Sequence, residues 1–299
     1  MLRIKKSKKV QGKSQLELEL KRPFENDRNH HLGGKSFYFF DFDDNVIYLT
    51  TPIVVFHKDT GKELFLSSSE WAQYHHDIGI KFPYNDYYID YEEEKGSFRY
   101  FRDQDISILE KVKGSKQTFL TDIENALKEI DYSWKAPSWN CFYHAVYNNR
   151  PMSIITARGH NINTIKKGIN LLAQKGHIPT TPNFLSIYPV TNTKVRKLLG
   201  DIELKQSVAE LKRSAIRESV EAAIKKYGYS PFHRFGMSDD DPKNIELITE
   251  EMKYLKRKYS EMSFFVIQTF EHSYKKFEIL PKKKQKKKKE DSTKQLNLF

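Results

Sequence analysis

FYFFDFDDN, residues 37–45, is the stretch that decides the fold of this chain, because an apolar run ends there abruptly in acidic residues. Four bulky apolar residues in a row, 37–40, are typical of a strand that is buried on both faces, as in a parallel sheet. Asp41 and Asp43 follow directly, so their carboxylates lie just beyond the strand. The stretch therefore predicts a central strand that carries acidic side chains to one edge of a sheet.

Residues 150–270 show the alternation of strand and helix that is typical of an α/β fold with a mainly parallel sheet. Apolar runs predict strands at 152–155, 184–190, 233–237 and 262–270, the last of these being the final strand. Apolar residues at helical spacing predict helices at 162–176, 207–228 and 245–259. The middle helix has clear bounds, since Ser207 and Glu210 have capping-box spacing and Gly228 is a stop signal.

Residues 46–145 carry weaker signals. IVVFHKDTGKELFL, residues 53–66, has two apolar runs around the turn signal at 59–61 and predicts a β-hairpin. Residues 67–70 then predict a helix start, and residues 118–130 predict a further helix. The rest is rich in tyrosine, phenylalanine and acidic residues, so we expect an insertion of mixed structure.

The net charge of +12, from 51 Lys and Arg against 39 Asp and Glu, points to polyanionic partners: nucleic acid, phosphorylated ligands or an acidic protein surface. Residues 282–289 contain seven lysines, and residues 1–14 contain six Lys or Arg. Such a lysine run also suits a solubilising disordered tail, and it can mimic a nuclear-localisation signal. The run alone leaves these alternatives open.

No apolar stretch is long enough to cross a bilayer, so we expect no contact with a membrane. Residues 1–15 are basic and lack the apolar centre of a secretion signal. Cys141 is the only cysteine, which excludes an intrachain disulfide and suits a reducing compartment. Together these features predict a soluble cytoplasmic protein.

Polar groups end three of the predicted strands: Asp41 and Asp43, then Thr156, and then Asp239 and Asp240. In open α/β sheets the ligand site lies beyond the carboxyl ends of the strands, so these clusters are expected to converge. Carboxylate oxygens are the ligands that Mg²⁺ prefers, and the ion would offset their mutual repulsion. The sequence therefore predicts a magnesium site at this edge.

These residue types can also carry phosphoryl transfer. Asp41 can attack a phosphorus atom and form an aspartyl-phosphate. Asp43, two residues on, can protonate the leaving oxygen and later activate water. The hydroxyl of Thr156 and a lysine ammonium group can hold the non-bridging oxygens, where charge accumulates in the transition state.

Three segments, in this order, resemble motifs of the haloacid dehalogenase-like superfamily. Residues 37–43, FYFFDFD, are similar to its first motif, and residues 153–159, SIITARG, are similar to its second. Residues 235–244, FGMSDDDPKN, are similar to its fourth, in the form Asp-Asp-x-x-x-Asn. The resemblance implies a Rossmannoid core with a mainly parallel sheet, a β-hairpin flap, and a cap inserted between motifs one and two.

The resemblance also implies roles for individual residues. Asp41 would be the nucleophile and Asp43 the acid/base, with Mg²⁺ held by Asp41, Asp43 and Asp239. We expect Asp240, beside Asp239, to complete the metal site. The third motif, a lysine early in a later helix, matches Lys212 by its spacing. Lys205 is the alternative for this lysine. Just after Asp43 the chain departs from the family's pattern, because Asn45 stands where the family usually has Thr or Val.

The chain is thus expected to divide into a few segments. The haloacid dehalogenase-like core takes 34–66 and 146–280, and the cap takes 67–145. A basic segment, 1–33, precedes the core, and a lysine-rich disordered tail, 281–299, follows it.

The last five residues, QLNLF, resemble the peptide by which bacterial proteins bind the replicative sliding clamp. A short apolar peptide on a flexible charged spacer is a usual layout for a docking motif. The resemblance implies four anchors, namely Gln295, Leu296, Leu298 and Phe299. The lysine run just upstream would then lie close to DNA and bind its phosphates without sequence preference.

The leading hypothesis from the sequence is a magnesium-dependent phosphatase that acts on DNA ends or nucleotides in the bacterial cytosol or nucleoid. Two alternatives stay open. One is a phosphatase of small metabolites whose tail serves only localisation, and the other is a catalytically inactive adaptor of the sliding clamp.

Overall fold

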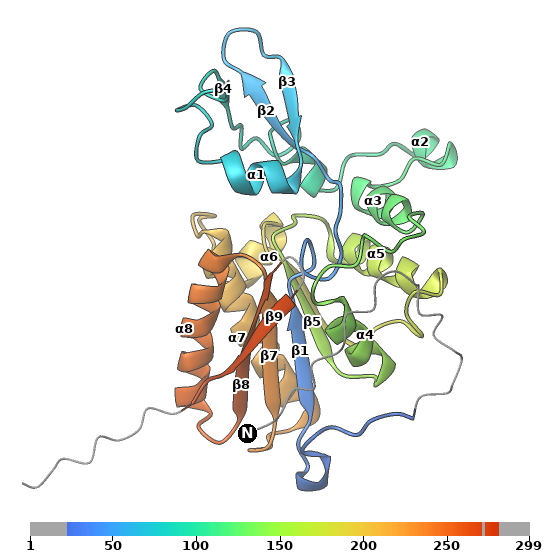
Figure 1. Cartoon of the computed structure of the whole chain (residues 1–299), viewed down its shortest axis with the longest axis vertical. Helices are drawn as coiled ribbons and strands as arrows, with labels where there is room; N and C mark the ends of the chain where they lie inside the picture. The colour runs from blue at the N-terminus through green and yellow to red at the C-terminus, as the bar shows by residue number, and fades with distance from the viewer. Residues whose placement is uncertain (1–22, 271–272, 281–299) are drawn as a thin grey trace, which may run out of the picture.

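The computed structural model describes residues 23–270 and 273–280. Its main sheet has six strands, in the order β6 (Phe184–Pro189), β5 (Met152–Thr156), β1 (Ser36–Phe40), β7 (Arg234–Asp239), β8 (Ser263–Phe270) and β9 (Ser273–Glu278). The strands from β6 to β8 are parallel, and β9 is antiparallel to β8. The predicted α/β fold with a mainly parallel sheet is therefore confirmed (Figure 1).

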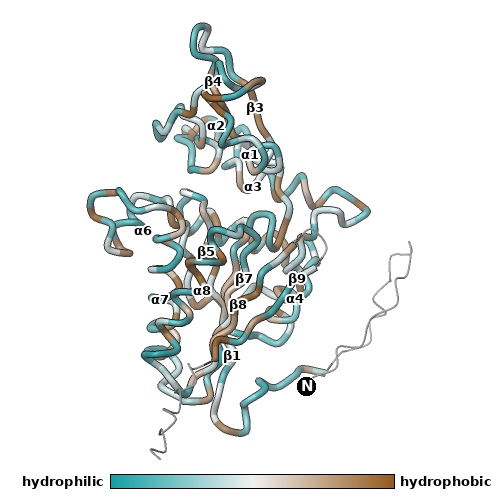
Figure 2. Tube along the Cα trace, turned by 60° about the vertical axis from the view of Figure 1, so that its left-hand side comes forward, coloured by the Kyte–Doolittle hydropathy of each residue, from teal (hydrophilic) through white to brown (hydrophobic). Residues whose placement is uncertain are grey.

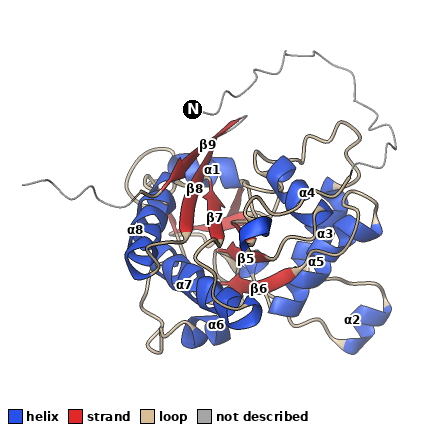
Figure 3. Ribbon diagram, turned by 90° about the horizontal axis from the view of Figure 1, so that it is seen from below, coloured by secondary structure: helices blue, strands red, loops and turns tan. Residues whose placement is uncertain are grey.

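The central strand β1 is buried on both of its faces. Phe37 and Phe39 pack into one hydrophobic cluster with α7 (Val208–Tyr227) and α8 (Pro242–Lys258). Phe40 packs on the other face with α3 (Thr118–Ala126), α4 (Trp139–Tyr147) and α5 (Ile162–Gln174). Helices thus cover both faces of the sheet, as Figure 3 shows from below. Because both faces of β1 are covered, its side chains are apolar in a continuous run.

Local signals set the bounds of several elements. Ser67 and Ser207 each form a capping box, with Glu70 and Glu210, at the start of α1 (Ser68–Tyr74) and α7. Gly228 ends α7 with a φ of +81°, a conformation that favours glycine. A short helix, α6 (Thr193–Leu198), follows β6, and a single 3-10 turn, η1 (His30–Leu32), precedes β1.

A smaller lobe lies beyond the carboxyl ends of the main strands (Figure 1). The predicted hairpin is confirmed as β2 (Ile53–His57) and β3 (Glu63–Leu66), and β4 (Tyr87–Tyr88) pairs with β2. Helix α1, the 3-10 turn η2 (Arg99–Phe101) and the short α2 (Ile108–Val112) follow in the same region. The lobe has its own small apolar cluster, centred on Val55, Leu66 and Ile78.

The structure corrects three expectations about segment bounds. Helices α3 and α4 belong to the main hydrophobic core, so the predicted insertion at 67–145 includes residues that are not part of the lobe. The hairpin at 53–66, which we grouped with the core, lies in the lobe with β4. The strand at 262–270 is not the last one, because β9 follows it and forms the edge of the sheet.

Apolar segments concentrate in the strands of the main sheet, where Figure 2 shows the longest brown stretches. Within the described residues, no helix combines the length and the apolar character that crossing a bilayer requires. Residues 1–22 and 281–299, with the lysine run and the predicted docking peptide, lie outside the described residues.

Candidate active site

The carboxyl ends of β5, β1 and β7 lie side by side, because these strands are neighbours in the parallel part of the sheet. Asp41 follows β1, Thr156 ends β5 and Asp239 ends β7, so the three positions meet at one edge. The backbone N–H of Asp41 donates to the carbonyl oxygen of Ser238 at 2.9 Å, which extends the pairing of β1 with β7 by one residue. The site is therefore built on strand ends that the sheet holds in place.

Three carboxylates form the centre of this edge. Asp41, Asp239 and Asp240 each offer an oxygen atom, and these three atoms lie within 4.8 Å of one another. Asp239 is fully buried and Asp41 is nearly so. Buried like charges at such distances repel each other strongly, so the cluster needs cations close by.

Lys212 supplies one of these cations from the second turn of α7. Its Nζ lies 3.0 Å from Asp41 Oδ2 and 2.7 Å from Asp239 Oδ2, and its side chain is buried. Burial alone would lower the pKa of Lys212, but the two carboxylates outweigh it and raise that pKa. Lys205, the alternative lysine, forms an exposed ion pair with Glu203 and is not part of this contact.

The second oxygen of Asp239 is held by the start of α8. Its Oδ1 accepts from the backbone N–H of Asp241 and from Asn244 Nδ2, both at 3.1 Å. Asp241 is the N-cap of α8 and accepts in turn from the N–H of Lys243. The three consecutive acids at the end of β7 thus have different roles. Asp239 and Asp240 face the site, and Asp241 caps the start of α8.

Asp43 lies at the same edge but in a different contact. Its carboxylate accepts from Arg158 Nε at 2.9 and 3.0 Å and from Arg158 Nη2 at 2.7 Å. Thr156 Oγ1 also donates to Asp43 Oδ2, at 3.0 Å. We expected Asp43 in the metal group together with Asp41, Asp239 and Asp240. The group whose oxygen atoms lie together contains only the other three, and the Asp43 carboxylate contacts Arg158.

The sequence suggests only that Arg158, just after Thr156, could touch the substrate, and its contact with Asp43 was not predicted. Its guanidinium group is buried between the rings of Phe101 and Phe119, 4.8 and 4.7 Å from their centroids. Its Nη2 also donates to Thr51 Oγ1 at 2.6 Å, and that hydroxyl group donates to the carboxylate of Asp122. Phe101 lies in the lobe and Phe119 in the core, so Arg158 joins the two parts next to Asp43.

Asn45 ties the strand ends together. Its Nδ2 donates to the carbonyl oxygen of Asp41 at 2.9 Å and to Ser238 Oγ at 2.8 Å. Its Oδ1 accepts from Ser138 Oγ and Thr269 Oγ1, both at 3.0 Å. Because all of these groups are buried, an amide that both donates and accepts satisfies them better than a hydroxyl would. This network explains why Asn suits a position where the resembled family usually has Thr or Val.

Several acids of the site hold their protons more tightly than usual. Burial, and to a lesser extent the neighbouring carboxylates, raise the pKa of Asp41 well above its ordinary value, against the opposing effect of Lys212. Burial and the charge of Asp239 raise the pKa of Asp240 to about 6. Burial and the charge of Asp43 raise the pKa of Asp44 to about 7. Lys212 therefore offsets only part of the cost of ionising these buried acids.

The donor set fits a metal ion. Asp41, Asp239 and Asp240 supply only carboxylate oxygens, which are the ligands of hard divalent cations such as Mg²⁺. A cation would also relieve the repulsion that raises the pKa values of Asp41 and Asp240. These three residues therefore form a group that can hold a metal ion.

Replacing one of these acids should stabilise the protein when metal is absent. The pKa of Asp240 is raised in the folded state, so its ionisation costs stability as the pH rises from about 4 through about 6. We expect Asp240→Asn to raise the free energy of unfolding at pH 7, in the presence of a chelator, by on the order of 2 kcal/mol. Added Mg²⁺ should then stabilise the wild type more than the variant. Urea denaturation with and without Mg²⁺ measures both effects.

Asp59→Asn is the matched control, because Asp59 is exposed at the hairpin turn of β2 and β3. Its stability should follow the wild type in both conditions. Equal stabilisation of Asp240→Asn and the wild type by Mg²⁺ would exclude Asp240 as a metal ligand.

Comparison of the chain with protein-family models, with curated proteins and with solved structures finds no match. The function must therefore be inferred from the chemistry of the site itself.

Proposed function

We propose that this protein is a magnesium-dependent phosphohydrolase that acts through an aspartyl-phosphate at Asp41. The observation that carries the proposal is the contact of Lys212 with both Asp41 and Asp239, beside a third carboxylate at Asp240. A buried lysine between two strand-end carboxylates is a costly arrangement, which a purely structural role does not require. The order of the motifs along the chain, which resembles the haloacid dehalogenase-like superfamily, supports the same function.

In this proposal Asp41 attacks the phosphorus atom, and the bond from phosphorus to the leaving oxygen breaks. Asp43 gives its proton to that oxygen, so the product alcohol departs uncharged. Asp43 then takes a proton from a water molecule, which attacks phosphorus and breaks its bond to Asp41. A Mg²⁺ ion held by Asp41, Asp239 and Asp240 would neutralise charge on the phosphoryl oxygens. Lys212 orients Asp41 and adds positive charge at the same place.

Arg158 has a positioning role in this scheme. Its two-pronged contact fixes the carboxylate of Asp43 at the edge of the site. The contact must loosen for the Asp43 carboxyl group to reach the leaving oxygen. Since Arg158 packs on Phe101 of the lobe, movement of the lobe can couple to that change.

We propose that the lobe acts as the cap, with the hairpin of β2 and β3 as the flap. It lies beyond the strand ends that carry Asp41 and Asp239 (Figure 1), which is where a substrate would enter. Its size and exposed aromatic residues favour a substrate with flat groups, such as a nucleotide or a DNA end.

The substrate test compares phosphate release, with Mg²⁺, from 3′-phosphorylated DNA, 5′-phosphorylated DNA, mononucleotides and para-nitrophenyl phosphate. We expect release from all four and the highest kcat/KM on one of the DNA ends. Higher kcat/KM on mononucleotides would place the substrate among small metabolites. No release from any of them would contradict the proposed activity and favour an inactive adaptor.

We propose further that residues 295–299 bind the bacterial sliding clamp and recruit the enzyme to DNA. Deleting these five residues should abolish clamp binding, measured by surface plasmon resonance, because all four anchors are lost. Activity on para-nitrophenyl phosphate should be unchanged, since none of the proposed catalytic residues is deleted. Deletion of 290–294, which shortens the spacer but keeps the peptide, is the control. Equal clamp affinity of the wild type and the 295–299 deletion would exclude this docking peptide.

A further inference from the structure

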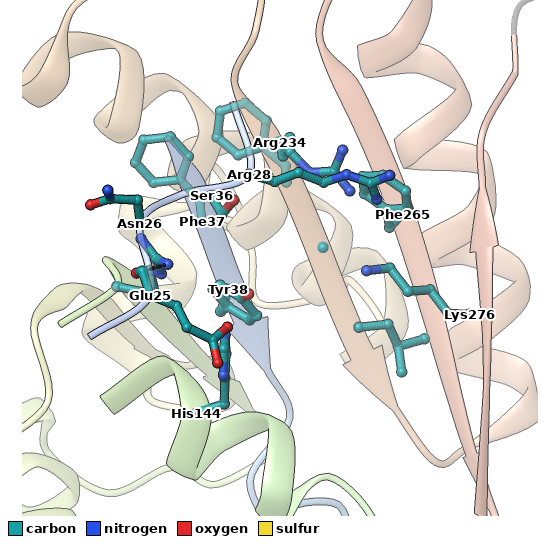
Figure 4. Close-up of a pocket in the computed structure, with 14 residues that line it drawn as sticks. Glu25, Asn26, Arg28, Ser36, Phe37, Tyr38, His144, Arg234, Phe265 and Lys276 are labelled. Carbon is teal, nitrogen blue, oxygen red and sulfur yellow. Dashed lines mark hydrogen bonds between the residues drawn. The ribbon is translucent and has the colours of Figure 1, made fainter. Parts of the chain in front are cut away.

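A hollow of about 340 Å³ lies on the face of the main sheet, away from the carboxylate cluster. Its floor is formed by residues of β1, β7 and β8, among them Tyr38, Gly236 and Phe265. Helix α4 borders one side through His144, and β9 borders the other through Lys276 (Figure 4). The hollow thus occupies the part of this face that α3, α4 and α5 leave open.

Three cations gather on one side of the hollow: Arg28, Arg234 and Lys276 (Figure 4). Arg234 and Lys276 both pack on the ring of Phe265, each 4.5 Å from its centroid. Asp27, next to Arg28 in the chain, pairs with Arg150. Glu278 offsets part of the charge of Arg234 and Lys276, and Glu25 lines the far end beside His144. The side of the hollow next to β9 is therefore distinctly positive.

The positive charges beside Arg234 and Lys276 disfavour the charged forms of these two side chains. Burial lowers the pKa of Arg234, and the charge of Arg28 lowers it further. The pKa of Lys276 is lowered first by the partial desolvation of its ammonium group, and then by the charges of Arg234 and Arg28. An anion between the three would remove this repulsion.

Arg28 is held in place by a buried ion pair next to it. Arg150 Nη1 lies 2.8 Å from Asp27 Oδ1, and both side chains are nearly inaccessible. The same Asp27 oxygen accepts from the backbone N–H of Ser36 at 2.8 Å. The segment before β1 is thus fixed across the start of the strand, and Arg28 follows directly from it.

The hollow lies on strands that end at the candidate active site. Along β9, Tyr274 points to the same face as Lys276, because side chains alternate along a strand. Tyr274 is 60% exposed and pairs in register with Thr269, whose hydroxyl group donates to Asn45 at the catalytic edge. From Arg234 to Asp239 the chain advances five residues, or about 16 Å.

We propose that this hollow binds backbone phosphates of single-stranded DNA whose end lies in the active site. Positive side chains that track a backbone, next to an exposed aromatic ring, are the features by which proteins hold single strands. At about 3.4 Å per stacked nucleotide, the distance of about 16 Å from Arg234 to Asp239 corresponds to about five nucleotides. The inference rests on the proposed function only for the placement of the strand end.

The test measures binding of the full chain to a fluorescent oligonucleotide of about ten nucleotides without a terminal phosphate, by anisotropy. The variant is the triple substitution R28Q, R234Q and K276Q. We expect its Kd to be roughly tenfold weaker than that of the wild type. The slope of log K against log salt should fall by about 2, since each phosphate contact on a single strand contributes about 0.7.

The matched control is K225Q, K253Q and R257Q, which removes three exposed charges from α7 and α8 on the opposite face. Its Kd should stay within about twofold of the wild type, although the net charge changes equally. Because Arg234 and Lys276 pack on Phe265, R28Q alone tests the hollow without touching the sheet. Its Kd should rise two- to threefold.

Two results would overturn the inference. One is an equal loss of affinity in the hollow variant and its control. The other is binding of a mononucleotide as tight as that of the oligonucleotide, which would assign the hollow to a free phosphate ligand. Neither measurement uses catalysis, so a failure of the phosphohydrolase proposal is recognised separately, by absent phosphate release.

Discussion

Asp41→Asn should reduce kcat on para-nitrophenyl phosphate by at least about a thousandfold, which corresponds to about 4 kcal/mol of barrier. The amide has nearly the shape of the carboxylate. Its oxygen can still accept the hydrogen bond that the backbone N–H of Phe42 donates to Asp41 Oδ1 at 2.9 Å. It is a far weaker nucleophile, so the covalent step should fail while the fold survives. Steady-state phosphate release with Mg²⁺ measures the effect, and circular dichroism verifies the fold.

The control for this substitution is Asp59→Asn, an identical chemical change at the exposed turn of the hairpin. It should keep the activity of the wild type. If Asp41→Asn retained more than about a tenth of wild-type kcat, then Asp41 would not be the nucleophile.

Lys212→Met should both destabilise the protein and inactivate it. Without the lysine, Asp41 and Asp239 face each other in a buried site with no compensating charge. Removing one partner from a buried ion pair costs about 3–5 kcal/mol, so a loss of this size is expected in urea denaturation with a chelator. Added Mg²⁺ should recover part of the stability, because the ion would replace some of the lost positive charge.

Lys205→Met is the matched control, since Lys205 is exposed and its ion pair with Glu203 lies on the surface. Its stability should change by less than about 0.5 kcal/mol. The double substitution Lys212→Met with Asp239→Asn should be more stable than Lys212→Met alone, because it removes one of the two negative charges that repel each other, at Asp41 and Asp239. Equal stability of the single and double variants would show that the carboxylates do not repel one another.

The strand ends of the site could be predicted from the sequence for a physical reason. The apolar run before Asp41 is typical of a strand buried on both faces, and the rule that ligands lie beyond parallel strand ends then brings Asp41, Thr156 and Asp239 together. Lys212 follows from its place in a helix whose capping box is legible in the sequence. These predictions depend on local patterns joined by one general rule of topology.

Other features have no local signal. Every residue of β9 is exposed, so the strand lacks the apolar alternation that would reveal it. The contacts from Asp43 to Arg158, and from there to Thr51, join residues more than a hundred positions apart. Helix α4 carries Trp139 and Phe142 into the core, but it follows a tyrosine-rich stretch and was therefore assigned to the insertion.

The measurement that tests the central claim most directly is the location of a phosphoryl group on the protein during turnover. The enzyme is mixed with Mg²⁺ and a phosphorylated substrate, quenched in acid, digested, and analysed by mass spectrometry. The account predicts a phosphoryl group on the peptide that contains Asp41, present in the wild type and absent in Asp41→Asn. Phosphate release by the wild type with every peptide unmodified, or with the phosphoryl group on another residue, would contradict it.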